Sequence, residues 1–140
     1  MSTAAPNPSQ SESAAAIARA VLLIDADAVT RKVARRILET EGYLVTEASG
    51  GRDALAKLHE GASVELVVTD LKMSDGSGGW LLAQLGYEFP ALLSRTLVLS
   101  DDAHGAAAAH VAARWHCAVL AKPFAPADLV HALGLLTREG

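Results

Sequence analysis

The chain has 140 residues, of which 51% are apolar and 20% charged, so it is long enough to bury the core of one ordinary domain. Its formal net charge of −4 argues against a nucleic-acid binder, which needs a basic surface. No apolar stretch reaches the about 18–20 residues that a membrane span requires, so no membrane partner is expected. The single Cys117 cannot form an internal disulfide, and no secretory signal is evident. These features favour a reduced, cytoplasmic location.

Residues 1–17 are mainly Ser, Ala, Pro, Asn and Gln, which cannot bury enough apolar surface to order themselves, so we predict a disordered tail. The rest, residues 18–140, alternates short apolar runs with helical periodicity. The predicted strands are 20–25, 43–47, 65–70, 95–100 and 117–121. The predicted helices run from about 29 to the glycine at 42 and over 51–59, 78–86, 103–115 and 126–137. Strict alternation predicts a single α/β domain with a doubly wound, five-stranded parallel sheet.

The first predicted helix combines an apolar face with a basic cluster. Its apolar face carries Val29, Val33, Ile37 and Leu38. We interpret the basic cluster as a solvated face of the helix rather than a binding patch, and its members are Arg31, Lys32, Arg35 and Arg36.

Four predicted strands end on polar residues that phosphate chemistry can use, namely Asp25, Asp70, Ser100 and Lys122. Because the carboxyl ends of parallel strands lie along one edge of a sheet, where ligands bind, we expect these side chains in one cleft. A carboxylate can attack phosphorus and carry an acyl phosphate. Asp25 and Asp70 could hold a hard cation such as Mg²⁺, Lys122 could neutralise phosphoryl charge, and a hydroxyl could bind a phosphoryl oxygen.

About residues 19–138 resemble the receiver domain of response regulators in two-component signalling, which has a flavodoxin-like (βα)5 fold. The stretch Asp70–Gly78 is similar to the phosphoacceptor Asp and its loop, which usually reads D-x-x-M-P-x-x-D-G in the family. Ser100 matches the Ser or Thr that moves on phosphorylation. Lys122 and Pro123 match a family Lys-Pro-Phe motif whose Lys–Pro bond is usually cis.

The resemblance implies a switch in which Asp70 accepts a phosphoryl group from a histidine kinase or a histidine phosphotransfer protein. It implies that Mg²⁺ is held by Asp25, Asp70 and the backbone carbonyl of Lys72. It also implies a protein that is not an enzyme, beyond self-phosphorylation and slow self-dephosphorylation. The signal is expected to leave through protein–protein contact with a downstream protein, at a surface formed by about 103–138.

Three positions depart from the family pattern. The family has a second acid where this chain has Ala26, so we expect weak Mg²⁺ binding, unless Asp27 compensates. Asp101 stands where the family prefers a small residue after the switch hydroxyl, and it adds bulk and repulsion there. Val119 replaces the aromatic residue that often precedes the lysine by three positions, so the usual relay from hydroxyl to aromatic cannot operate in that form.

Two alternatives remain open at this stage. One is a degenerate receiver that binds partners without efficient Mg²⁺-dependent phosphorylation. The other is a haloacid-dehalogenase-type phosphatase, because the stretch from Asp25 to Thr30 also resembles the D-x-D-x-x-T motif of that family, with Asp25 as nucleophile and Asp27 as acid/base. Against this second alternative, Ala28 stands where that family usually has Gly, and the loop after Asp70 is left unexplained.

Overall fold

The structure is a computed structural model that describes residues 19–139, so the predicted tail at 1–17 lies outside the described residues. Its sheet has five strands in the order β2-β1-β3-β4-β5, and every neighbouring pair is parallel. The strands are β1 (Ala20–Ile24), β2 (Leu44–Ala48), β3 (Leu66–Asp70), β4 (Thr96–Ser100) and β5 (Ala118–Ala121). This topology confirms the predicted doubly wound, flavodoxin-like parallel sheet.

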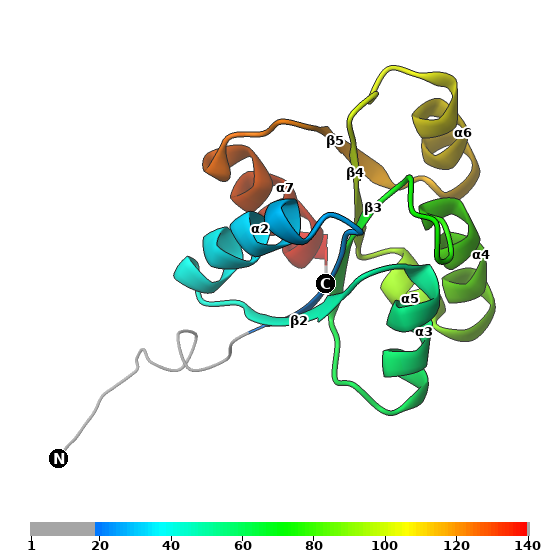
Figure 1. The fold of residues 1–140 in the computed structure, drawn as a ribbon, viewed down its shortest axis with the longest axis horizontal. Coiled ribbons are helices and arrows are strands. Elements are labelled where there is room, and N and C mark those ends of the chain that lie inside the picture. The colour runs from blue at the N-terminus through cyan, green and yellow to red at the C-terminus, as the bar shows by residue number, and fades with distance from the viewer. Residues whose placement is uncertain (1–18, 140) are drawn as a thin grey trace, which may run out of the picture.

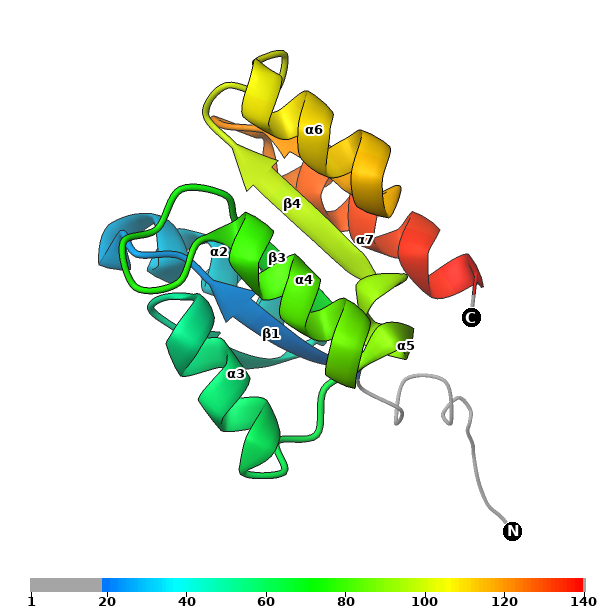
Figure 2. The same cartoon turned by 90° about the vertical axis from the view of Figure 1, so that its right-hand side faces the viewer.

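Helices cover both faces of the sheet (Figures 1 and 2). One face packs against α2 (Ala28–Thr40) and α7 (Pro126–Glu139), and the other against α3 (Gly51–His59), α4 (Gly78–Glu88) and α6 (Ala106–Trp115). A four-residue helix that was not predicted, α5 (Pro90–Leu93), joins α4 to β4. Among residues 19–139, no helix combines the length and the apolar character that a membrane crossing demands.

Both sides of the central strands are buried. In β1, Val21 and Leu23 pack in the cluster beneath α2 and α7, whereas Leu22 and Ile24 pack in the cluster beneath α3, α4 and α6. Successive side chains of a strand point to opposite faces, so a strand covered on both faces must be apolar at every position. This explains the uninterrupted apolar runs in the sequence.

The apolar face predicted for the first helix is confirmed at Ile37 and Leu38 but is wrong at Val29 and Val33. Its buried side chains are Ala34 and Leu38, whereas Val29 is 71% and Val33 55% exposed. Residues four apart share a helix face, but adjacent residues are rotated by about 100°, so burying Ala34 turns Val33 outward. The ends of the strands differ from the predicted bounds by one residue, and α6 begins at Ala106 rather than 103.

Candidate functional site

Polar side chains gather at the carboxyl edge of the sheet. Asp25 directly follows β1, and Lys122 directly follows β5. Asp70 and Ser100 are the last residues of β3 and β4. The Lys122 N–H donates to the Ser100 carbonyl at 2.8 Å, which continues the β4–β5 ladder to the end of the site. The four residues that the strand pattern singled out therefore lie on four neighbouring strands.

The Lys122 ammonium lies between two carboxylates. Its Nζ donates to Asp25 Oδ2 at 2.9 Å and lies 3.3 Å from Asp70 Oδ2. Asp25 is 1% exposed, and the side chains of Asp70 and Lys122 are also largely buried. Two carboxylates share one ammonium, so a net negative charge remains in a poorly solvated site that favours a further positive charge.

The pKa values of the site follow from burial and from this pairing. Burial raises the pKa of Asp70, and the charge of Asp25 adds to the rise, against the opposing effects of Lys122 and the Leu71 N–H. Burial alone would lower the pKa of Lys122, but its hydrogen bond to Asp25 and the negative charges of Asp70 and Asp25 outweigh burial and raise it. Lys122 is therefore a permanent cation at neutral pH.

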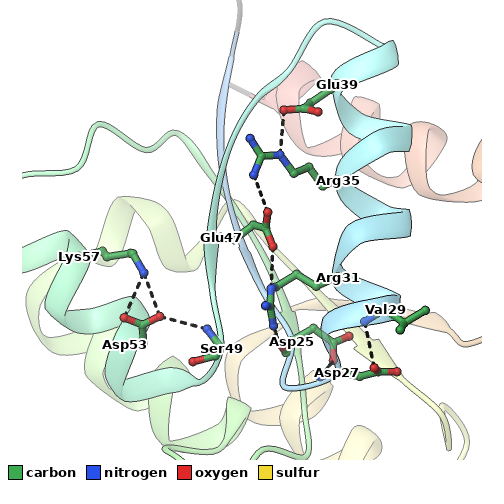
Figure 3. Close-up of polar contacts among 10 residues, drawn as sticks. All are labelled: Asp25, Asp27, Val29, Arg31, Arg35, Glu39, Glu47, Ser49, Asp53 and Lys57. Carbon is green, nitrogen blue, oxygen red and sulfur yellow. Dashed lines mark hydrogen bonds and ion pairs between the residues drawn. The ribbon is translucent and has the colours of Figure 1, made fainter.

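Asp25 is held at each of its polar atoms. Its N–H donates to the Ala48 carbonyl at 3.2 Å. Its carbonyl accepts from Arg31 Nη1 at 2.6 Å (Figure 3). Its carboxylate accepts from the Asp27 N–H at Oδ1, 2.9 Å away, and from Lys122 at Oδ2. The buried acid thus cannot turn away from Lys122 without losing contacts on several sides.

Asp27 forms the N-cap of α2. Its Oδ1 accepts from the Val29 N–H at 3.1 Å, as Figure 3 shows, and its Oδ2 accepts from the Thr30 hydroxyl at 2.7 Å. The hydrogen bonds from Thr30 and Val29 lower the pKa of this exposed carboxylate. Both oxygens therefore serve the first turn of the helix, as is typical of an N-cap aspartate.

The switch hydroxyl and its neighbour have different surroundings. Ser100 is 3% exposed, and its Oγ accepts from the Asp102 N–H at 3.1 Å. Asp101 points to solvent, and its Oδ1 lies 3.9 Å from Lys72 Nζ, with both side chains about 70% exposed. Such exposed pairs contribute little to stability. Val119 packs against the cluster beneath α3, α4 and α6.

The loop after Asp70 returns closely over the strand that carries it. The Gly78 N–H donates to the Leu71 carbonyl at 3.0 Å, and a Cβ on Gly78 would lie 2.5 Å from the Asp70 carbonyl oxygen. Only glycine permits this approach, which explains its place at the start of α4. On the opposite side of the site, the Lys122–Pro123 peptide bond is cis.

Sequence reasoning missed two residues: Arg31, which contacts Asp25 at the site, and Glu47, which binds Arg31. Arg31 does not belong to a solvated face: its side chain is 18% exposed and binds both the Asp25 carbonyl and Glu47 of β2. Arg35 also binds Glu47, whereas Lys32 and Arg36 are exposed as expected. The sequence held one clue, because Glu47 is a charged residue inside a predicted strand. Predicting that it binds Arg31 would have required knowing that α2 packs over β2.

Comparisons with known proteins identify the class. The family model described as "Response regulator receiver domain" matches residues 21–134, so the chain belongs to the receiver domains of two-component signal transduction. Receiver domains are generally signalling modules without enzymatic activity. This membership leaves the haloacid-dehalogenase alternative, with Asp25 as nucleophile, without support.

A curated relative is a kinase. Over 105 residues the chain is 33% identical to the sensor kinase CckA of Brucella abortus (strain 2308), which corresponds to 74% of this chain and 11% of that protein. The chain therefore spans only a small part of the length of this relative.

Solved structures show the same fold. The signal receiver domain of an HD domain-containing protein from Pseudomonas fluorescens Pf-5 has a TM-score of 0.79 at 22% identity, over 88% of this chain and 97% of that one. A response regulator receiver protein from Sinorhizobium medicae WSM419 has a TM-score of 0.75 at 27% identity, over 86% and 95% of the two chains. A CheY-like receiver from Methanospirillum hungatei JF-1 has a TM-score of 0.75 at 25% identity, over 89% and 100%.

Receiver domains typically bind Mg²⁺ at their acidic pocket, so the donor set of this site bears on the fit of that ion. Within residues 19–139, no three His, Cys, Asp or Glu side chains come close enough together to hold a metal ion. Two carboxylates remain at the site, on Asp25 and Asp70, and Ala26 offers no side-chain oxygen. Mg²⁺ is commonly bound through one or two carboxylates and several waters, so the residues fit the ion with a reduced set of ligands.

Proposed function

We propose that this receiver is a phosphorylation-controlled switch that accepts a phosphoryl group on Asp70 from a histidine kinase or a histidine phosphotransfer protein. The observation that carries the proposal is the position of Lys122 Nζ, 3.3 Å from Asp70 Oδ2 and 2.9 Å from Asp25 Oδ2. A carboxylate beside a permanent cation can attack phosphorus while the incoming negative charge is neutralised.

The chain's own residues supply most of what this transfer needs. Asp70 attacks the phosphorus of the donor phosphohistidine, and the bond between phosphorus and the imidazole nitrogen breaks as the acyl phosphate forms. Lys122 then exchanges its contact with Asp70 Oδ2 for one with a phosphoryl oxygen. Ser100 accepts a hydrogen bond from Asp102 and so keeps its own proton to donate to a second phosphoryl oxygen. Movement of Ser100 and of the turn that follows it toward the phosphoryl group would be the switching event.

Asp25, Asp70 and the Lys72 carbonyl would hold Mg²⁺ at this site. When bound, the ion would neutralise charge on the transferred phosphoryl group. We expect the affinity to be low because Ala26 supplies no ligand and because Lys122 already occupies Asp25 Oδ2. We propose that Asp27 stays outside this ligand set, since both of its oxygens are engaged in capping α2.

A second candidate function is a degenerate receiver that binds a partner without efficient phosphorylation. The observation that favours it is that Lys122 pairs with both Asp25 and Asp70 while Ala26 supplies no further carboxylate to attract a divalent cation. Such a site is stable without phosphate. Phosphorylation kinetics distinguish the two candidates.

For the output we propose the surface formed by α6, β5 and α7. β5 is at the edge of the described sheet, and beside it lies a hollow of about 310 Å³ with apolar lining from β5 and α7, including Leu120 and Leu135. Leu135 is 46% exposed. The similarity to a sensor kinase over the receiver favours a kinase-linked pathway, which we place in the cytoplasm.

The test is incubation of the purified protein with a small phosphodonor, with and without Mg²⁺, followed by mapping of the phosphorylated residue by mass spectrometry. We expect the phosphoryl group on Asp70, with loss of labelling in Asp70→Asn. Asp75→Asn, which changes an exposed carboxylate of the same loop, is the matched control and should label normally. Labelling that survives Asp70→Asn but disappears in Asp25→Asn would overturn the proposal. A wild type that stays unlabelled with small donors and with histidine kinases would favour the degenerate receiver.

A further inference from the structure

One guanidinium links three elements beneath the site. Arg31, in the second turn of α2, donates from Nη1 to the Asp25 carbonyl at 2.6 Å and from Nε to Glu47 Oε1 in β2 at 2.7 Å (Figure 3). Its side chain is 18% exposed, and that of Glu47 is 24% exposed. The planar fork of arginine allows two such bonds in fixed directions, which lysine cannot reproduce.

These contacts close a ring through the fold. The Asp25 N–H is bonded to the carbonyl of Ala48, the residue after Glu47, and the Asp25 carbonyl is bonded to Arg31, which returns to Glu47. The N-terminus of α2 is fixed independently by the Asp27 cap. The segment from Asp25 to Asp27 is therefore held from β2 on one side and from α2 on the other.

We infer that Arg31 is a positioning residue for the phosphoacceptor site: by holding the Asp25 backbone, and with its guanidinium oriented by Glu47, it keeps the Asp25 carboxylate against Lys122. Lys122 in turn faces Asp70, so the position of Asp25 determines where the one ammonium of the site lies. The expected effect on the phosphorylation rate rests on the proposed function, whereas the expected effect on the position of Asp25 does not.

This role has particular weight in the present chain. Because Ala26 stands in place of a second acid, Asp25 alone supplies the carboxylate at the end of β1 that contacts Lys122 or a cation. Misplacement of a reacting or charge-stabilising group by about 1 Å can cost up to a hundredfold in rate. Contacts that hold Asp25 should therefore affect phosphorylation more than they affect stability.

Arg35 provides a matched control within the same network. It also binds the Glu47 carboxylate, together with Glu39 in its own helix, but it has no hydrogen bond to Asp25. Arg31→Gln and Arg35→Gln thus each remove one arginine from Glu47. Only Arg31→Gln releases the Asp25 carbonyl.

The test compares wild type, Arg31→Gln, Arg31→Lys, Arg35→Gln and Glu47→Gln in three measurements. These are urea unfolding, amide hydrogen exchange at Asp27, whose N–H is bonded to Asp25 Oδ1, and phosphorylation rate as a function of donor concentration. In Arg31→Gln we expect faster exchange at Asp27 and a maximal phosphorylation rate lower by on the order of tenfold, with little change in the half-saturating donor concentration. Arg35→Gln should leave both at wild-type values, and Glu47→Gln should lie between them.

Distinct results would overturn the inference. If Arg31→Gln and Arg35→Gln change exchange and rate equally, the network is merely structural. If Arg31→Lys restores wild-type values in full, charge alone suffices and the double hydrogen bond has no positioning role. If wild type is not phosphorylated, the proposed function fails, while exchange at Asp27 still decides whether Arg31 holds Asp25. Should Arg31→Gln not fold, Glu47→Gln is compared with Arg35→Gln instead, because it takes from Arg31 the carboxylate that orients its guanidinium, and equal exchange at Asp27 in these two variants would overturn the inference.

Discussion

Lys122 Nζ donates a hydrogen bond of 2.9 Å to Asp25 Oδ2, across 97 positions of sequence, and thereby joins the ends of the first and last strands of the chain. The same nitrogen lies 3.3 Å from Asp70 Oδ2. The electrostatics of the site follow from this shared ammonium, since one cation must serve two largely buried carboxylates.

Removing that cation should destabilise the fold. Lys122→Met leaves Asp25 and Asp70 without their common partner, and breaking a buried ion pair from one side costs about 3–5 kcal/mol. The raised pKa of Lys122 means that its contribution is fully present below the pKa of an unfolded lysine and is lost only as pH rises through the higher folded value. Urea unfolding at neutral pH therefore measures the full effect.

Lys72→Met is the control for this experiment. It removes an exposed lysine whose nearest acid, Asp101, is 3.9 Å away, and the free energy of unfolding should change by no more than about 0.5 kcal/mol. Equal destabilisation by the two substitutions would show that the Lys122 ammonium contributes no more to the free energy of unfolding than an exposed lysine does.

Neutralising Asp70 should have the opposite effect. Burial and the nearby Asp25 raise the pKa of Asp70, so folding favours its protonated form. The contribution of a group with a raised folded pKa is present below its unfolded pKa, about 3.9 for Asp, and is lost as pH rises through the folded pKa. Asp70→Asn avoids that loss and should stabilise the protein at neutral pH, as measured by urea unfolding.

The pH series checks the sign of this effect. The difference between Asp70→Asn and wild type should be largest at neutral pH and should vanish below the unfolded pKa, where wild-type Asp70 is itself neutral. A destabilised variant at neutral pH would mean that the attraction between Asp70 and Lys122 exceeds the penalty of burial.

Restoring the missing acid should strengthen metal binding. Ala26→Asp adds a carboxylate next to Asp25, and we expect Mg²⁺ affinity to rise at least tenfold, which corresponds to about 1.4 kcal/mol. Isothermal titration with Mg²⁺ measures the difference, and Ala28→Asp, a nearby exposed position at the start of α2, controls for added negative charge. An unchanged affinity would mean that another group, such as Asp27 or Asp101, already completes the ligand set.

The close return of the loop over β3 should be intolerant of a side chain. Gly78→Ala places a methyl group 2.5 Å from the Asp70 carbonyl oxygen and 2.9 Å from the Leu71 Cα, so we expect destabilisation of about 1–3 kcal/mol and a shift of the phosphoacceptor backbone. Thermal unfolding measures the first effect.

Gly79→Ala is the matched control, because its Cβ would meet nothing closer than Ser77 Oγ at 4.0 Å. Alanine is favoured over glycine within a helix, so this variant should be neutral or more stable by about 0.5–1 kcal/mol. If both alanines behave alike, steric contact with β3 is not what requires Gly78.

Much of the fold was predictable because its signals are local. Strands buried on both faces need continuous apolar runs, and strict alternation with helices requires parallel pairing, so the sheet and most helices could be predicted. The helix α5 was missed because its four residues, of which Pro90 is the first, are too few to show a helical periodicity. The exposure of Val29 and Val33 was missed because these valines recur at the same helical spacing as Ile37, and only the packing shows that Ala34 and Leu38 face the sheet.

The sequence by itself determined which residues reach the carboxyl edge, because a strand that ends on a polar residue presents it there whatever the strand order. It also determined that Ala26 offers no carboxylate. Only the tertiary structure decided that Lys122 pairs with both Asp25 and Asp70, and that Arg31 binds Asp25 and Glu47 rather than solvent. Those contacts exist because β1 and β3 are neighbours in the sheet and because α2 packs over β2. Both relationships join segments that are remote in sequence, so no local sequence pattern encodes them.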